Sequence, residues 1–177
     1  MQILWAALLS SVFVYVGVLF FLRGQTPAAE LRAPMLPWAF AAAAFASLGA
    51  SVVLPRTLHR QAARTAAQNL ATQEVFAEQL PGGAGLRGAP SSTRVFADPA
   101  AAEAAAFQTA LTPMILACAL RESVALFGLV LGFMGAPPAA WAPFIAVGAL
   151  AIAAEMPSRP RVRGAFERAT GVGFPAG

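Results

Sequence analysis

Four long apolar segments, separated by short or polar connections, dominate the pattern of hydrophobic and polar positions along the chain. Residues 3–22 carry no charged side chain, and a helix of this length measures about 30 Å, enough to cross the hydrocarbon core of a bilayer. The other apolar segments are 36–54, 111–134 and 139–154. This pattern predicts an all-α polytopic membrane protein with four transmembrane helices.

One long polar connection, 55–108, separates the second apolar segment from the third and is predicted to be partly helical. Residues 56–80 are rich in Ala, Gln and Glu and are expected to form a helix outside the bilayer. A glycine-rich break and a loop follow at 81–85 and 88–93. Asp98 and Pro99 are typical of an N-cap and a first helical position, so a new helix is predicted to begin there and to lead into the third span.

The remaining connections are short. Pro27 and Pro34 discourage helix continuation in the linker 23–34. Residues 135–138 read Gly-Ala-Pro-Pro and predict a tight turn that makes the third and fourth spans an antiparallel hairpin. The chain is therefore expected to have four parts: two transmembrane helices in 1–54, a cytoplasmic loop in 55–108, a transmembrane hairpin in 109–156 and an arginine-rich cytoplasmic tail in 157–177.

The distribution of arginine predicts the orientation. The chain has no lysine, and nine of its twelve arginines fall in 55–108 or in 157–177. Cytoplasmic loops of membrane proteins carry an excess of basic residues. We therefore expect both termini and the long loop to lie in the cytoplasm, with the spans in a bacterial-type inner (plasma) membrane.

The composition excludes several classes of soluble protein. Only 11% of the residues are charged, whereas a soluble domain has about 25%. Cys118 and His59 are the single residues of their types, and the sequence contains no metal-ligand set, phosphate-binding loop or nucleophile elbow. No catalytic activity, cofactor or metal is predicted. The pI near 11 is not accompanied by a basic patch with aromatic residues, so no nucleic acid is expected.

Small residues at helical spacing are candidates for helix packing, because lipid provides no hydrophobic drive for association and close approach of the backbones must replace it. The second span offers Ala43, Ala46 and Gly49, and the third offers Gly128 and Gly132 in one GxxxG spacing. Ser10, Ser11 and Tyr15 in the first span are expected to hydrogen-bond across helices. The expected partners are the bilayer and other membrane subunits or copies of the same chain.

Arg121 and Glu122, in the middle of the third span, are the only charged residues within any predicted span. A charged side chain at the bilayer centre costs several kcal/mol unless it is paired, hydrated or neutralised. Because burial disfavours the charged form of a carboxyl group, Glu122 is expected to take up and release a proton. Neighbouring side chains on a helix point about 100° apart, so Arg121 is expected to form a strained pair with Glu122 or to face another helix or a water-filled cavity.

Residues 119–130, which read ALRESVALFGLV, resemble the ion-binding helix of the rotary ATPase proteolipids, the c subunits of F-type and the K-type subunits of V-type enzymes. Those helices have a Glu followed by a small residue, an apolar pair, an aromatic residue and Gly-Leu-Val or a similar sequence. The resemblance implies that Glu122 is the ion-binding carboxylate, with Ser123 and Phe127 in the surrounding pocket. We include Arg121 with Glu122 and Ser123 in the candidate ion-binding set.

Two functional hypotheses follow. In the first, the chain is a proteolipid-like subunit that binds or translocates a proton or sodium ion through Glu122 and works in an oligomer. In the second, it is a non-catalytic accessory or scaffold subunit of a membrane complex, and Arg121 and Glu122 form a structural polar pair. A small membrane enzyme is the least favoured reading, because no nucleophile is visible.

Overall fold

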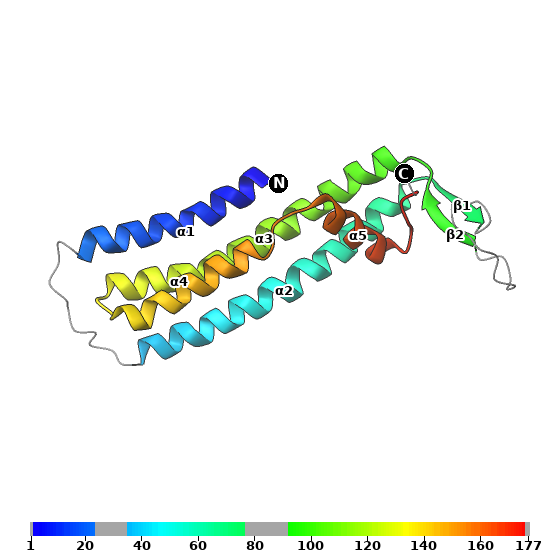
Figure 1. Cartoon of the computed structure of the whole chain (residues 1–177). Coiled ribbons are helices and arrows are strands. Elements are labelled where there is room, and N and C mark those ends of the chain that lie inside the picture. Colours follow the sequence, from blue (N-terminus) through cyan, green and yellow to red (C-terminus); the bar gives the residue numbers. More distant parts are fainter. Residues whose placement is uncertain (1, 24–34, 77–91, 176–177) are drawn as a thin grey trace, which may run out of the picture. The chain divides into compact units, whose positions relative to one another are not determined.

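The computed structural model describes residues 2–23, 35–76 and 92–175 (Figure 1). Helices account for most of these residues, and two short strands form the remaining regular structure. In chain order the elements are α1 (Gln2–Arg23), α2 (Leu36–Gln68), β1 (Thr72–Phe76), β2 (Ser92–Phe96), α3 (Pro99–Phe133), α4 (Pro138–Ala153) and α5 (Arg159–Thr170). The linker predicted at 23–34 lies, beyond Arg23, outside the described residues, as do the break at 81–85 and most of the predicted loop at 88–93.

In the part of the chain that the structure describes, three helices are long and apolar enough to cross a membrane: Gln2–Phe21 in α1, Leu36–Gln68 (α2) and Pro99–Phe133 (α3). The fourth apolar helix, α4, has 16 residues, or about 24 Å of helix. Many large apolar side chains on the long helices face outward, including Ile3 at 88% exposure and Trp38 at 78%. Water disfavours such faces and lipid does not, which supports a membrane protein.

The chain divides into two compact units. We call Met1–Pro55 with Met114–Pro157 the apolar unit, and Arg56–Pro113 with Ser158–Gly177 the polar unit. Helices α2 and α3 contribute to both, and each contains an internal proline close to the division, Pro55 and Pro113. Proline lacks the backbone N–H donor of a regular helical turn.

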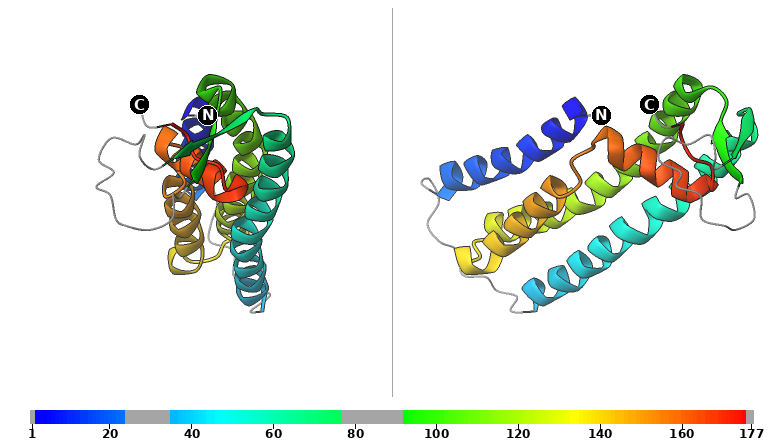
Figure 2. Two further views of the ribbon diagram at one scale, coloured as in Figure 1. Left: turned by 90° about the vertical axis from the view of Figure 1, so that its right-hand side faces the viewer. Right: turned by 45° about the vertical axis from the view of Figure 1, so that its right-hand side comes forward.

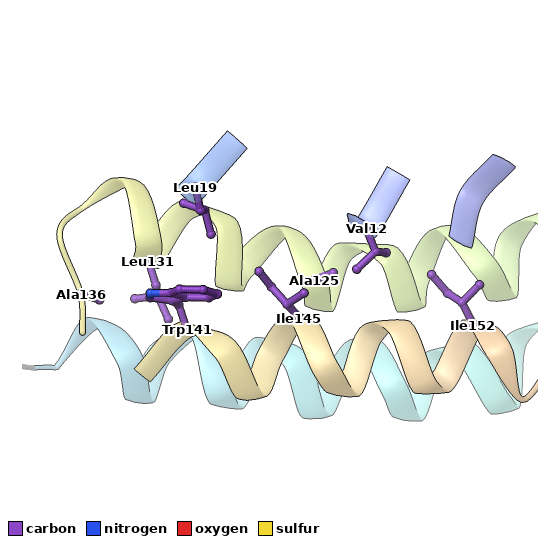
Figure 3. Packing of buried hydrophobic residues seen from close by; sticks show 8 residues of the cluster. All are labelled: Val12, Leu19, Ala125, Leu131, Ala136, Trp141, Ile145 and Ile152. Atoms are coloured by element: carbon purple, nitrogen blue, oxygen red, sulfur yellow. The ribbon is translucent and has the colours of Figure 1, made fainter. Parts of the chain in front are cut away.

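The core of the apolar unit lies where α1 meets the α3–α4 hairpin (Figure 3). The buried and partly buried residues of α1 recur every three or four positions, which places them on one face. They are Trp5, Leu9, Val12, Tyr15, Val16 and Leu19. Opposite them, α3 provides Ala125 and Leu131, and α4 provides Trp141, Ile145 and Ile152.

Glycines determine how closely the helices of the apolar unit approach. A Cβ atom at Gly128 would lie 2.7 Å from the backbone oxygen of Trp141, and one at Gly148 would lie 2.9 Å from the Cβ of Ala125. Helices α3 and α4 therefore pack backbone to backbone. After a turn that includes Gly135 at φ 81°, α4 returns beside α3 (Figures 1 and 2).

The other predicted packing residues differ in their surroundings. A Cβ at Gly132 would lie 2.5 Å from a methyl carbon of Leu19, so α1 packs closely against α3 at this glycine. A Cβ at Gly49 would meet no described atom within 4 Å; Ala46 is also exposed, and Ala43 is half-buried. Of these glycines, Gly128 and Gly132 of α3 and Gly148 of α4 therefore lie at close helix contacts, and Gly49 does not.

The polar unit contains a β-hairpin that the sequence pattern did not predict. The helix expected over 56–80 ends at Gln68, and the prediction is wrong for Thr72–Phe76, whereas 77–80 lie outside the described residues. Thr72–Phe76 pairs antiparallel with Ser92–Phe96, matching Thr72 with Phe96. Hydrogen bonds from the N–H groups of Asn69 and Leu70 to carbonyls three residues back close the last turn of α2. Ser92 and Thr93, predicted in a loop, belong to β2.

A small core joins the elements of the polar unit. Phe96 and Phe166 are fully buried, and their rings lie 5.6 Å apart at the centroids. Ala63, Ala102, Ala106 and Val162 are also buried in this cluster. The tail predicted only as arginine-rich thus contains α5, which ends at Thr170. Gly171 follows as the C-cap with φ 72°, and its N–H donates to the carbonyl of Glu167.

The predicted start of α3 is confirmed. The Asp98 carboxylate accepts hydrogen bonds from the backbone N–H groups of Ala100 and Ala101, each at 3.0 Å, and Pro99 is the first helical residue. These bonds satisfy donors that have no partner within the helix. The helix then continues through Pro113 into the apolar unit, so the predicted polar helix and the predicted third span are one element.

A carboxyl site between two apolar helices

Glu122 lies half-buried on α3, and its side chain is directed towards α1. The Oε1 atom is 2.6 Å from Ser11 Oγ and 2.6 Å from Tyr15 Oη. Ser11 and Tyr15 are four residues apart and therefore share one face of α1, separated by one helical turn. The cross-helix hydrogen bonds expected of the first span are confirmed for these two hydroxyls, whereas Ser10 donates to the carbonyl of Ala7 in its own helix.

The hydrogen atoms available at this site can be counted. Ser11 Oγ is also 2.7 Å from the carbonyl oxygen of Leu8. Three short contacts thus join Tyr15, Glu122, Ser11 and Leu8, but the two hydroxyls carry only one hydrogen each. A protonated Glu122 supplies the third hydrogen: Tyr15 then donates to Glu122, Glu122 to Ser11, and Ser11 to Leu8.

The same site accommodates the ionised carboxylate. Both hydroxyls then donate to Oε1, and Ser11 no longer donates to the Leu8 carbonyl. Hydrogen bonds to a charged acceptor are about twice as strong as neutral ones, which offsets that loss. The arrangement can therefore hold the carboxyl group in either protonation state with only the rotation of one hydroxyl.

Arg121 extends in another direction and ties α3 to α2 and α4. Its Nη2 donates to Glu155 Oε1 at 2.7 Å, and its Nη1 donates to the carbonyl of Ala151 at 3.1 Å. Its Nε donates to Ser51 Oγ at 3.3 Å. The guanidinium is almost completely buried, with 9% of the side chain exposed, whereas 47% of the Glu155 side chain is exposed.

These contacts agree with one of the two alternatives predicted for Arg121, that it faces another helix. The carboxylate that forms an ion pair with Arg121 is Glu155, just beyond the end of α4. Because consecutive side chains diverge by about 100° around a helix, Arg121 reaches α2 and α4 while Glu122 reaches α1. The sequence signal that points to Glu155 is an acidic residue at the end of an apolar segment that must run antiparallel to the third.

Two residues that the proteolipid resemblance places in the pocket around Glu122 have other partners among the described residues. The Ser123 hydroxyl donates to the carbonyl of Leu120, at 2.7 Å, within its own helix. The ring of Phe127 stacks on that of Phe40 in α2, with centroids 5.4 Å apart. The hydroxyls around the carboxyl group come from α1, and the sequence signal for them is a pair of hydroxyl residues four positions apart in an otherwise apolar helix.

Helix α1 is held against the hairpin at three levels. Trp5 Nε1 donates to the carbonyl of Ile152 at 2.8 Å. Ser11 and Tyr15 contact Glu122 one to three turns further along, and Leu19 packs over Gly132 beyond them. The carboxyl site is therefore flanked by a hydrogen bond on one side and by apolar packing on the other.

The site brings two hydroxyl groups of α1 to one carboxyl oxygen of α3. Among the described residues, no group of three or more His, Cys, Asp or Glu side chains could hold a metal ion. Comparisons with protein-family models, curated proteins and solved structures give no match for this chain.

Proposed function

We propose that this chain is a small integral membrane subunit that binds a proton at Glu122 and works together with other membrane subunits or copies of itself. The observation that carries this proposal is the set of three short contacts linking Tyr15, Glu122, Ser11 and the Leu8 carbonyl. If each contact is a separate two-centre hydrogen bond, the carboxyl group must contribute the third hydrogen. A group that is neutral in this state also avoids the cost of a charge in lipid.

The same contacts favour a proton over sodium. A sodium ion at Glu122 would need the oxygen lone pairs of neighbouring groups directed at it, as hard cations do in general. Here the hydroxyls of Ser11 and Tyr15 lie 2.6 Å from the carboxyl oxygen itself, a distance typical of an O–H···O hydrogen bond.

The resemblance of residues 119–130 to the proteolipid helix supports the same role for Glu122. In this proposal α4 completes a set of four spans, and the arginine-rich polar unit lies on the cytoplasmic side, as the arginine distribution favours. The site would differ from the proteolipid pattern in one respect: the hydroxyls come from α1 and not from the carboxylate helix.

The scaffold function remains the second candidate because a specific observation favours it. Arg121 links α2, α3 and α4 through three hydrogen bonds, one of which is also the ion pair to Glu155. Such a network stabilises one packing arrangement, and removing one partner leaves the other uncompensated. In our proposal this is the structural role of Arg121, and it operates beside the proton site and not within it.

Labelling with dicyclohexylcarbodiimide tests the proposal, because this apolar reagent modifies protonated carboxyl groups. The purified protein in detergent is treated over a range of pH, and the modified residue is identified by mass spectrometry of peptides. We expect modification of Glu122 that increases as the pH is lowered and does not change when sodium chloride replaces choline chloride.

Two variants make the result specific. Glu122→Gln should abolish the labelling, and Glu155→Gln, which removes the other carboxyl group among the described residues of the apolar unit, should leave it. Protection by sodium but not by choline would favour sodium as the ion. Absence of labelling at Glu122 at every pH, with an intact fold, would leave only the scaffold role.

A further inference from the structure

The polar unit has a strong excess of positive charge. Its described residues include eight arginines and four acidic residues. The arginines are Arg56, Arg60, Arg64, Arg94, Arg159, Arg161, Arg163 and Arg168, and the acids are Glu74, Asp98, Glu103 and Glu167. Some of these arginines have side-chain partners: Arg94 lies 3.8 Å from Glu74, and Arg163 lies over the ring of Phe174.

The arginines of α2 have few side-chain partners among the described residues. Arg56, Arg60 and Arg64 are all exposed and recur every four residues, which places them on one face over about 12 Å of helix. Arg64 donates a long hydrogen bond, 3.4 Å, to the carbonyl of Ala169. Among the described residues, Arg56 and Arg60 have no ion-pair or hydrogen-bond partner, and α2 contains no acidic residue.

Apolar surface accompanies this charge. Leu58 lies between Arg56 and Arg60 in sequence and is 41% exposed. In α2 the arginines begin immediately after the apolar part of the helix, so a helix that crosses the bilayer brings them to the headgroup layer within its next three turns. Arginine stems and nearby leucines can enter the acyl boundary while the guanidinium groups remain at the phosphates.

We propose that Arg56 and Arg60 on α2 bind the phosphate headgroups of anionic phospholipids. The planar guanidinium matches phosphate oxygens in a bidentate fashion. The choice of lipid over nucleic acid follows from the composition of the surface, because 56–68 contains no Phe, Tyr or Trp on which bases could stack. This binding surface is independent of the proton site at Glu122.

The test measures lipid retention by the full chain in a neutral detergent. Native mass spectrometry gives apparent dissociation constants for phosphatidylglycerol and for phosphatidylcholine with the same acyl chains. Each basic residue near a membrane surface strengthens anionic lipid binding about fivefold. We expect Arg56→Gln/Arg60→Gln to weaken phosphatidylglycerol binding about 25-fold and to leave phosphatidylcholine binding unchanged.

Two further variants control the comparison. Arg94→Gln removes an exposed arginine from the β-hairpin and should have little effect. Arg56→Lys/Arg60→Lys should retain part of the binding, because it keeps the charge but loses the bidentate geometry. Circular dichroism verifies that each variant is folded, which the helix propensity of Gln favours. Equal binding of phosphatidylglycerol by the double Gln variant and the unaltered protein would overturn the proposal. Tight binding of a short RNA duplex would also overturn it, if the double Gln variant loses the RNA but keeps the lipid.

Discussion

Replacing Glu155 by Gln provides a quantitative test of the Arg121 network. The variant removes the Glu155 carboxylate and leaves the Arg121 guanidinium with its bonds to the Ala151 carbonyl and Ser51. Removing one partner of a buried ion pair costs about 3–5 kcal/mol, and an exposed pair is worth about 0.2–1 kcal/mol. Since 9% of the Arg121 side chain and 47% of the Glu155 side chain are exposed, solvent screens one partner only. We expect a loss of about 2 kcal/mol in the free energy of unfolding.

The assay is unfolding of the purified protein in mixed micelles titrated with sodium dodecyl sulfate, followed by tryptophan fluorescence and circular dichroism. Glu103→Gln is the matched control, because Glu103 lies 3.9 Å from Arg159, whose side chain is 82% exposed. This control should lose about 0.5 kcal/mol or less.

A double variant completes the test of the network. Arg121→Met/Glu155→Gln should recover part of the loss caused by Glu155→Gln, because no uncompensated charge then remains. Equal stability of Glu155→Gln and the Glu103→Gln control would refute the reasoning. A double variant less stable than the sum of its single variants would refute it as well.

Three more predictions address the remaining packing and the site. Tyr15→Phe should shift the infrared carbonyl band of the protonated Glu122 side chain, because one hydrogen bond is lost, and should cost about 1 kcal/mol in the unfolding assay. Gly128→Val should destabilise the hairpin by at least about 1–3 kcal/mol through overpacking, whereas Gly49→Ala, with open space around it, should be neutral or stabilising by up to about 1 kcal/mol. Phe166→Ala should cost about 3–5 kcal/mol and change only the circular dichroism transition of the polar unit.

The long helices could be predicted from the sequence because apolar length is a local property. The segment 3–22 and the capping residue Asp98 need no knowledge of distant residues, and both predictions agree with the structure. The hairpin could not be found in this way. Thr72–Phe76 contains Gln and Glu, which favour helix as much as strand, and its pairing partner Ser92–Phe96 lies more than fifteen residues away.

The candidate site was predicted in part for a similar reason. The sequence identifies Glu122 as an exceptional residue, because a charge within an apolar segment stands out by itself. Its partners depend on helix register: the contact of Leu19 with Gly132 aligns α1 with α3, and the close approach at Gly128 aligns α4. No single segment contains that information, so Ser11 and Tyr15 could be foreseen only as hydroxyls in need of some acceptor.

Both hydroxyls that contact Glu122 belong to one face of α1. In the proposed function, the position of α1 and the protonation of the carboxyl group are therefore thermodynamically linked. A slide of α1 by one turn, about 5.4 Å, would remove both donors together. Whatever holds α1 in place, at Trp5 or at Leu19, therefore alters the affinity of Glu122 for its proton. Reciprocity requires that gain or loss of that proton alters the docking of α1 by the same free energy.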